Sequence, residues 1–308
     1  MDINDNVLNE LFKMTKIIVN NDLKRNNYNS DINHLLYIII PAFIIRYNIK
    51  NQNKIINTFK EVPIVLFEKE DRVHQAYYVS IPSITNNKIK TRKYIGINHY
   101  ANKPLLEYID NIIHEYNHAI NSMINEITFD KTSFSLRTGL TKTIYPKNDI
   151  RHPHKDDAYI LDEIINTRQT EEIINIINSF SNYHINDPEI TTALYSIGNS
   201  INKSYSSNAY YLQATICKEL MNNKTLISVL SNMRFNGNIE DIPYFFDNIT
   251  GIDNSYNKLI SILQQTIKEE QEFAKTKWFR SIKLSKIRSL YKDAKNIIDT
   301  FNANYHFK

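Results

Sequence analysis

The chain of 308 residues contains, at residues 111–120, the stretch NIIHEYNHAI, and this stretch decides how the rest of the sequence is organised. Its centre is the pattern His-Glu-x-x-His. On an α-helix, residues four positions apart lie one above the other on the same face, so His114 and His118 can direct their rings towards a common point. Glu115 follows the first histidine directly. These residue types at this spacing are typical of a helix that holds one zinc ion beside one general base.

The residues around this stretch have the spacing of an amphipathic helix. Apolar side chains recur every three or four positions from Leu105 to Ile127. Asn102 can cap the start of the helix, and Pro104 is tolerated in its first turn. The two histidines lie in the middle of the polar arc, opposite the apolar one. An alternative interpretation is that this arc is simply exposed to water and that its histidines bind nothing.

Composition predicts a soluble globular protein. The hydrophobic content of 42% is ordinary, and a formal charge of +4 is too small to indicate a nucleic-acid partner by itself. Cys217 is the only cysteine, which excludes a disulfide framework and a cysteine zinc site. The first residues lack the pattern of a secretory signal, and the apolar run at 35–45 is roughly half of the ~20 residues that a membrane-spanning helix needs. We therefore expect a cytoplasmic protein, with export by a route without a cleavable signal as the alternative.

The part of the chain before the histidine motif predicts an α+β arrangement. Amphipathic or apolar helices are expected at 6–20 and at 32–48, the second kinked or broken near Pro41. Three short runs rich in β-branched and aromatic residues predict strands at 64–67, 76–81 and 94–98. We expect a small N-terminal sheet packed on the motif helix. An exposed strand of this sheet could receive an extended peptide by edge pairing.

The part of the chain after the motif helix predicts mostly helix. A strand or hairpin is expected at 133–140, with Gly139 as a turn residue, followed by a polar loop at 146–157. Helices are then expected at 158–177, 189–203, 208–230, 253–275 and 279–301. The predicted division is an N-terminal α+β lobe, 1–130, and a mainly helical C-terminal lobe, 131–308, that carries a third metal ligand.

A catalytic zinc ion usually has three protein ligands and one open position, so two histidines are incomplete. Asn121 and Ile124 exclude the continuation in which a third histidine follows a glycine. The other common completion is a carboxylate from a later helix, and Glu163 is the first choice because polar residues follow it at helical spacing. The alternatives on ligand chemistry are Glu171, Glu172, His152 and His154.

The sequence resembles the gluzincin metallopeptidases, in which a glutamate on a second helix completes the histidine motif. The resemblance covers residues 94–177 and lies in the string HEYNHAIN, RTGL and LDEIINTRQTEEI. It looks, more narrowly, like uncharacterised bacterial metallopeptidase-like proteins that have a Gly-Leu segment between the two helices. The resemblance implies a zincin-like fold, zinc ligation by His114, His118 and Glu163, and a general base at Glu115. The chain departs from the pattern at Ile164 and at Asn166–Thr167, where these proteins often have a small residue and an acidic residue.

A zinc peptidase also needs a donor for the oxyanion of the transition state. Tyr205 is our choice for this second catalytic residue, and the other candidates are Tyr210, Tyr211, His152, His154 and Arg137. Asn111 or Asp110 can orient a ligand histidine through a hydrogen bond to its ring. The expected substrate is a peptide or protein, and the expected cofactor is Zn²⁺.

Two other functions compete with this interpretation. Residues 275–308 contain nine Lys or Arg against two Asp, which would suit a non-catalytic or toxin-like module that binds an anionic membrane or nucleic acid. A solvated helix face explains the same charges, so we predict at most weak contact with such a surface and no clear nucleic-acid or membrane partner. The third alternative is hydrolysis of an amide that is not peptidic.

Overall fold

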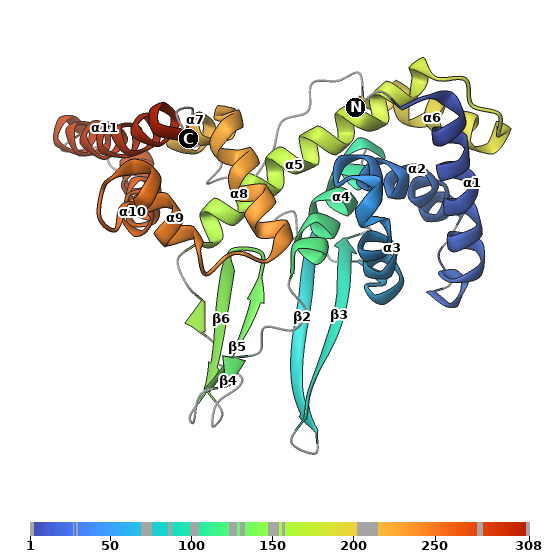
Figure 1. Ribbon diagram of the computed structural model, residues 1–308, viewed down its shortest axis with the longest axis horizontal. Helices are drawn as coiled ribbons and strands as arrows, with labels where there is room; N and C mark the ends of the chain where they lie inside the picture. The colour runs from blue at the N-terminus through green and yellow to red at the C-terminus, as the bar shows by residue number, and fades with distance from the viewer. Residues whose placement is uncertain are drawn as a thin grey trace. The chain divides into compact units, whose positions relative to one another are not determined.

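The computed structural model describes these residues: 3–26, 28, 30–68, 76–85, 88–98, 105–122, 128–129, 133–146, 154–155, 158–201, 215–275 and 280–305. They belong to the general α+β class that the sequence predicts, and helices dominate (Figure 1). The chain forms two compact units, and each is described by itself. The first unit contains residues 1–120 and 169–205, and the second contains 121–168 and 206–308. The lobe boundary predicted near residue 130 stays a prediction.

The helices of the first unit surround a very apolar one. The elements are α1 (Asp5–Asn21), η1 (Lys24–Asn26), α2 (Ser30–Arg46), η2 (Ile49–Asn51), α3 (Gln52–Glu61), η3 (Phe180–Asn182) and α6 (Pro188–Ile201). Helix α2 packs against α1, α3 and α6, and its residues 35–44 are buried. The predicted break at Pro41 is wrong, because α2 continues through it. A helix that is apolar on all sides gains enough from burial to outweigh the ~3 kcal/mol that an interior proline costs.

Membrane-spanning potential is limited to one combination. In the described residues, no helix by itself has the length and apolar character to cross a membrane, whereas Asp31–Arg46 and Ile49–Glu61, bent by 114°, reach that length and composition as a pair.

The predicted sheet of the first unit is present, with longer strands than expected. It contains β1 (Ile64–Phe67), β2 (Ala76–Thr85) and β3 (Lys88–Asn98), in the order β1-β3-β2. Strand β1 runs parallel to β3, and β2 runs antiparallel to it with Tyr77 opposite Gly96. A Cβ atom at Gly96 would overlap the Tyr77 ring, so glycine leaves room for that ring. β1 and β2 are the outer strands of these three.

Helix α4 (Leu105–Asn121) carries the histidine motif and is anchored in the first unit by its apolar arc. The buried residues of this arc are Ile109, Ile112, Ile113, Tyr116 and Ile120. The Tyr116 ring lies 3.9 Å from that of Phe59 of α3, between centroids. Its hydroxyl donates a hydrogen bond of 2.9 Å to the carbonyl oxygen of Val62, just before β1. This arc therefore fixes the direction in which the polar arc of α4 points.

The second unit contains the predicted hairpin. Its strands are β4 (Thr128–Phe129), β5 (Ser133–Thr138), β6 (Thr141–Pro146) and β7 (His154–Lys155), antiparallel and in that order. The turn between β5 and β6 is Gly139–Leu140, and Gly139 has a φ of +59°, which favours glycine. The predicted polar loop at 146–157 is wrong for His154 and Lys155, which form a strand with β6.

The helices of the second unit form a continuous apolar core. They are α7 (Thr215–Asn222), α8 (Lys224–Asn236), α9 (Ile242–Thr250), α10 (Ser255–Lys275) and α11 (Arg280–Tyr305). The single helix predicted at 208–230 is wrong, because α7 ends before Asn223 and α8 begins after it. The Asn223 side chain accepts a hydrogen bond of 3.1 Å from the backbone N–H of Leu226, which caps α8. Helix α9 was not predicted.

Helix α5 (Tyr159–Ser179) belongs to both units. The division between them falls at 168/169, inside this helix, which is unbroken along its 21 residues (Figure 1). The predicted helix at 158–177 is therefore confirmed. Glu163 lies in its first half, in the second unit.

Candidate metal centre

The two histidines of the motif lie one turn apart on α4, as their spacing predicts. Their ring centroids are 5.0 Å apart, with an angle of 74° between the ring planes. His118 is buried and His114 is partly buried. The alternative interpretation, that the polar face of α4 is simply exposed to water, does not fit the structure. Glu115, Asn117 and Asn121 on this side of the helix are buried as well. Such an environment favours defined side-chain positions over solvated ones.

A carboxylate from α5 joins the pair. Ligand atoms of His114, His118 and Glu163 all lie within 4.8 Å of one another, and Glu163 is partly buried. Within the described residues, this is the group of three His, Cys, Asp or Glu side chains whose geometry could hold a metal ion. Of the alternative ligands, Glu172 forms an ion pair with Arg46, with 2.6 Å between Oε2 and Nε.

The three donors suit zinc. Two imidazole nitrogens and one carboxylate oxygen are a common ligand set for catalytic zinc, and such ligands lie about 2.0–2.2 Å from the ion. In a tetrahedral site, they would be separated by about 3.5 Å. The set leaves one coordination position for water.

A buried hydrogen-bond chain in the first unit holds α4 against α5. The Tyr47 hydroxyl donates to Asn117 Oδ1 at 3.0 Å, and Asn117 Nδ2 donates to Thr170 Oγ1 at 3.1 Å. Asn117 lies inside the histidine motif, and Thr170 lies seven residues after Glu163, which is about two helical turns. The predicted polar stripe of α5 therefore faces α4, where Glu163 can serve as a ligand. Sequence reasoning missed Asn117, although its place in the motif is the signal that could have identified it.

Two buried polar atoms near the ligands have no hydrogen-bond partner in the part of the chain that the structure describes. They are Asn111 Nδ2, one turn before His114, and Thr167 Oγ1, one turn after Glu163. Buried donors are normally satisfied, so each marks a place where a water or a ligand group would be stabilised. The role predicted for Asn111 and Asp110, orienting a ligand histidine, stays a prediction.

The predicted oxyanion donors are not placed. Tyr205, Tyr210, Tyr211 and His152 lie outside the described residues, and only the backbone of His154 is described. Arg137 is buried and forms an ion pair with Glu240 of the second unit. Its guanidinium is therefore occupied by a carboxylate.

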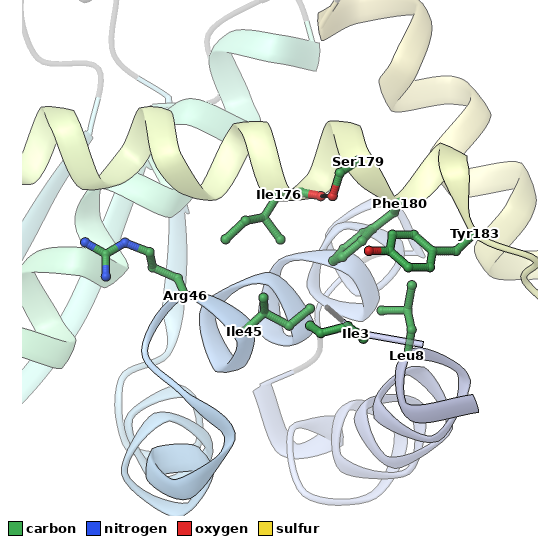
Figure 2. Close-up of a pocket in the computed structure, with 8 residues that line it drawn as sticks. All are labelled: Ile3, Leu8, Ile45, Arg46, Ile176, Ser179, Phe180 and Tyr183. Atoms are coloured by element: carbon green, nitrogen blue, oxygen red, sulfur yellow. Dashed lines mark hydrogen bonds between the residues drawn. The ribbon is translucent and has the colours of Figure 1, made fainter. Parts of the chain in front are cut away.

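A separate hollow in the first unit contains none of these ligands. It has a volume of ≈ 340 Å³ and is lined mainly by apolar side chains of α1, α2 and α5 with η3. Figure 2 shows that the Arg46 guanidinium points away from the apolar residues Ile45, Ile176 and Phe180. Ser179 at its edge donates its hydroxyl to the Ile176 carbonyl oxygen at 2.7 Å. The polar residues of its lining are Arg46, Ser179 and Tyr183.

Comparison of the chain with protein-family models, with curated proteins and with solved structures found no match.

Proposed function

We propose that this protein is a zinc-dependent metallopeptidase of the gluzincin type. The observation that supports it is the convergence of the His114 and His118 rings with the Glu163 carboxylate, with Glu115 adjacent on the same helix. The motif by itself is short, but its meeting with a carboxylate 45 residues further along the chain is a stronger indication. The resemblance to gluzincins assigns the same four residues.

The roles of the residues follow from their chemistry. His114, His118 and Glu163 would hold the ion, which would supply a bound water with a pKa near 7 and would polarise the scissile carbonyl. Glu115 would accept the proton of the attacking water and pass it to the leaving amine. Because Glu115 is buried, its carboxylate keeps a defined orientation for this proton transfer.

A peptide is the substrate that the surroundings of α4 favour. Among the three described strands of the first unit, β1 and β2 are the outer ones. An extended peptide can form backbone hydrogen bonds with an outer strand of a sheet. Val65, Leu66 and Ile81 on these strands are exposed apolar side chains. They would offer contacts to apolar side chains of the peptide.

The competing proposal of an anionic-surface module receives less support. On α11, Lys283, Lys286 and Lys295 form ion pairs with Glu272, Glu269 and Glu219 of the second unit. Their charge is therefore matched inside the unit. A surface that attracts phosphates would present such cations without carboxylate partners.

Metal content and activity test the proposal together. The purified protein should contain about one zinc per chain and cleave a mixed peptide library, with the products identified by mass spectrometry. Glu115→Gln should keep the zinc and lose activity by about 10²–10⁴-fold. His118→Ala should lose the zinc.

Glu171→Gln is the matched control, because it removes from the same helix a carboxylate that is only an alternative candidate and not one of the three proposed ligands. It should keep both the zinc and the activity. A wild-type protein without zinc, or a Glu115→Gln variant with full activity, would overturn the proposal.

A further inference from the structure

The second unit contains a buried ion pair directly beside the proposed ligand Glu163. Asp162 on α5 and Arg234 on α8 have side-chain exposures of 3% and 0%. Arg234 Nε lies 2.9 Å from Asp162 Oδ1, and Arg234 Nη2 donates to Asp162 Oδ2 at 3.1 Å. Nη2 makes the hydrogen bond and Nε an ion-pair contact, so the planar guanidinium meets both carboxylate oxygens and their relative orientation is restricted.

A third segment closes around this pair. The backbone N–H of Leu140, in the turn between β5 and β6, donates to Asp162 Oδ1 at 2.6 Å. Gly139 precedes it with a positive φ, and a Cβ atom there would overlap the Asp162 carboxylate. Arg234 also approaches Asn166, one turn further along α5, with Nη1 3.4 Å from its Oδ1. Two segments of the second unit, α8 and the Gly139–Leu140 turn, thus contact two successive turns of α5.

Stability alone is a poor explanation for such a pair. Removing two charges from water is costly, and well-packed apolar residues in place of a buried ion pair often keep or increase stability. Apolar contacts, unlike a hydrogen-bonded ion pair, do not fix the orientation of a helix about its own axis. Contacts from two segments to one carboxylate oppose rotation of α5 about its axis. Because successive side chains on a helix project about 100° apart, fixing Asp162 also fixes the direction of Glu163.

We propose that Asp162 and Arg234 are positioning residues that hold Glu163 in the orientation for metal binding, an inference that rests on the proposed zinc site. The Gly139–Leu140 turn contributes to the same positioning, because its backbone N–H donates a hydrogen bond to the Asp162 carboxylate. The pair acts through helix α5 and contacts no metal itself. Groups that orient ligands typically change metal affinity by about 10–100-fold when they are removed.

The test uses the full-length double variant Asp162→Leu with Arg234→Met, which replaces the pair by apolar side chains. Three quantities are measured: the melting temperature without metal, the zinc dissociation constant by competition with a chelator, and the visible absorption spectrum of the Co²⁺-loaded protein. We expect a melting temperature that is only modestly lower, because the Leu140 N–H loses its acceptor. The zinc dissociation constant should be about 10–100-fold higher, and the cobalt spectrum should be altered. The matched control is Glu219→Leu with Lys295→Met, a pair of the same unit that does not involve α5.

The outcomes separate this inference from the proposed function. Zinc affinity and a cobalt spectrum equal to wild type would overturn the positioning role while leaving the zinc site intact. A wild-type protein that binds no zinc would overturn both. If the double variant fails to fold, the Arg234→Lys variant tests the inference instead. Lysine keeps the positive charge but lacks the planar guanidinium that meets both carboxylate oxygens. Weakened zinc binding in a folded Arg234→Lys protein supports the inference, and unchanged binding overturns it.

Discussion

Helix α5 carries two arginine–carboxylate pairs with the same chemistry in different surroundings. Asp162 pairs with Arg234 in the second unit, with side-chain exposures of 3% and 0%. Glu172 pairs with Arg46 in the first unit, with exposures of 33% and 21%. Two segments, α8 and the Gly139–Leu140 turn, contact the Asp162 carboxylate. Arg46 Nε alone contacts Glu172, and the Arg46 guanidinium lies over the Tyr47 ring, 5.4 Å from the centroid. The difference teaches that burial, more than the ion pair itself, decides how strongly one side chain constrains a helix.

The largest effect is expected when the buried pair is broken on one side. Arg234→Met leaves the Asp162 charge buried without its cation, and we expect a loss of about 3–5 kcal/mol in the free energy of unfolding. Urea unfolding of the metal-free protein measures it. The double variant with Asp162→Leu should recover most of the loss. A single variant within about 1 kcal/mol of wild type would show that water reaches this site, since exposed pairs contribute about that much.

The turn that faces Asp162 allows a second test. Gly139→Ala should cost about 1–2 kcal/mol for the left-handed backbone, plus the displacement of the carboxylate by the new methyl group. Gly251→Ala is the matched control in the same unit, because Gly251 has a φ of +67° and open space around it. The excess loss at residue 139, measured by urea unfolding, reports the contact with Asp162. Equal losses of unfolding free energy in the two variants would show that the turn accommodates the new methyl group without displacing the Asp162 carboxylate.

These features differ in how far the sequence predicts them. The histidine spacing predicts α4, and the rule that zinc needs a third ligand selects Glu163, because both depend on local spacing and ligand chemistry. Alternating and β-branched runs likewise predict β1, β2 and β3. The short helices α3 and α9 were missed, because ten and nine residues give too few turns for a helical period to stand out. The break expected at Pro41 fails because α2 is buried against α1, α3 and the sequence-distant α6, and this tertiary packing cannot be read from the residues around the proline.

The buried pair could not be predicted, because Asp162 and Arg234 are 72 residues apart in the chain. A signal exists on α8, where Arg234 follows the buried residues Ile227 and Leu230 at helical spacing. An arginine on an apolar face needs a buried carboxylate, but the sequence offers many acidic residues and no means to choose one. The Gly139–Leu140 segment was singled out through the resemblance described above. Its physical role, a backbone donor to Asp162, appears only in the structure.

In the first unit, α5 is held by neutral hydrogen bonds through Asn117, whereas in the second unit it is held by the Asp162–Arg234 ion pair. Tyr47→Phe removes the donor to Asn117 Oδ1 in a buried site, and we expect a loss of about 1–2 kcal/mol. Asn117 would keep its hydrogen bond to Thr170, so zinc affinity should fall less than in the variants of Asp162 and Arg234. Tyr195→Phe on exposed α6 is the control, and should change neither quantity. If Tyr47→Phe weakens zinc binding more than the variants of Asp162 and Arg234 do, then the contacts of the first unit, and not the buried ion pair, control the orientation of Glu163.

The partly exposed pair should respond weakly. Arg46→Met is expected to lose about 0–1 kcal/mol in the free energy of unfolding, because water and salt screen this pair. The loss should shrink further in 1 M NaCl, whereas the loss in Arg234→Met should not. A salt-independent loss of several kcal/mol at Arg46 would mean that burial is not the property that separates the two pairs.

The smallest effect is expected at the most exposed pair, Glu219 with Lys295, whose side chains are 38% and 44% exposed. The hydrogen bond from Lys295, and next that from Tyr291, lowers the pKa of Glu219 below its usual value of 4.5. The folded protein therefore favours the ionised carboxylate. The stability that this adds over Glu219→Gln is present above pH 4.5 and disappears as the pH falls through the lowered pKa. Melting temperatures of the two proteins should thus differ slightly at pH 7 and converge near pH 3. Curves that stay apart at low pH would show that packing of the side chain, rather than its charge, stabilises this contact, and burial would then explain even the weakest of the three pairs.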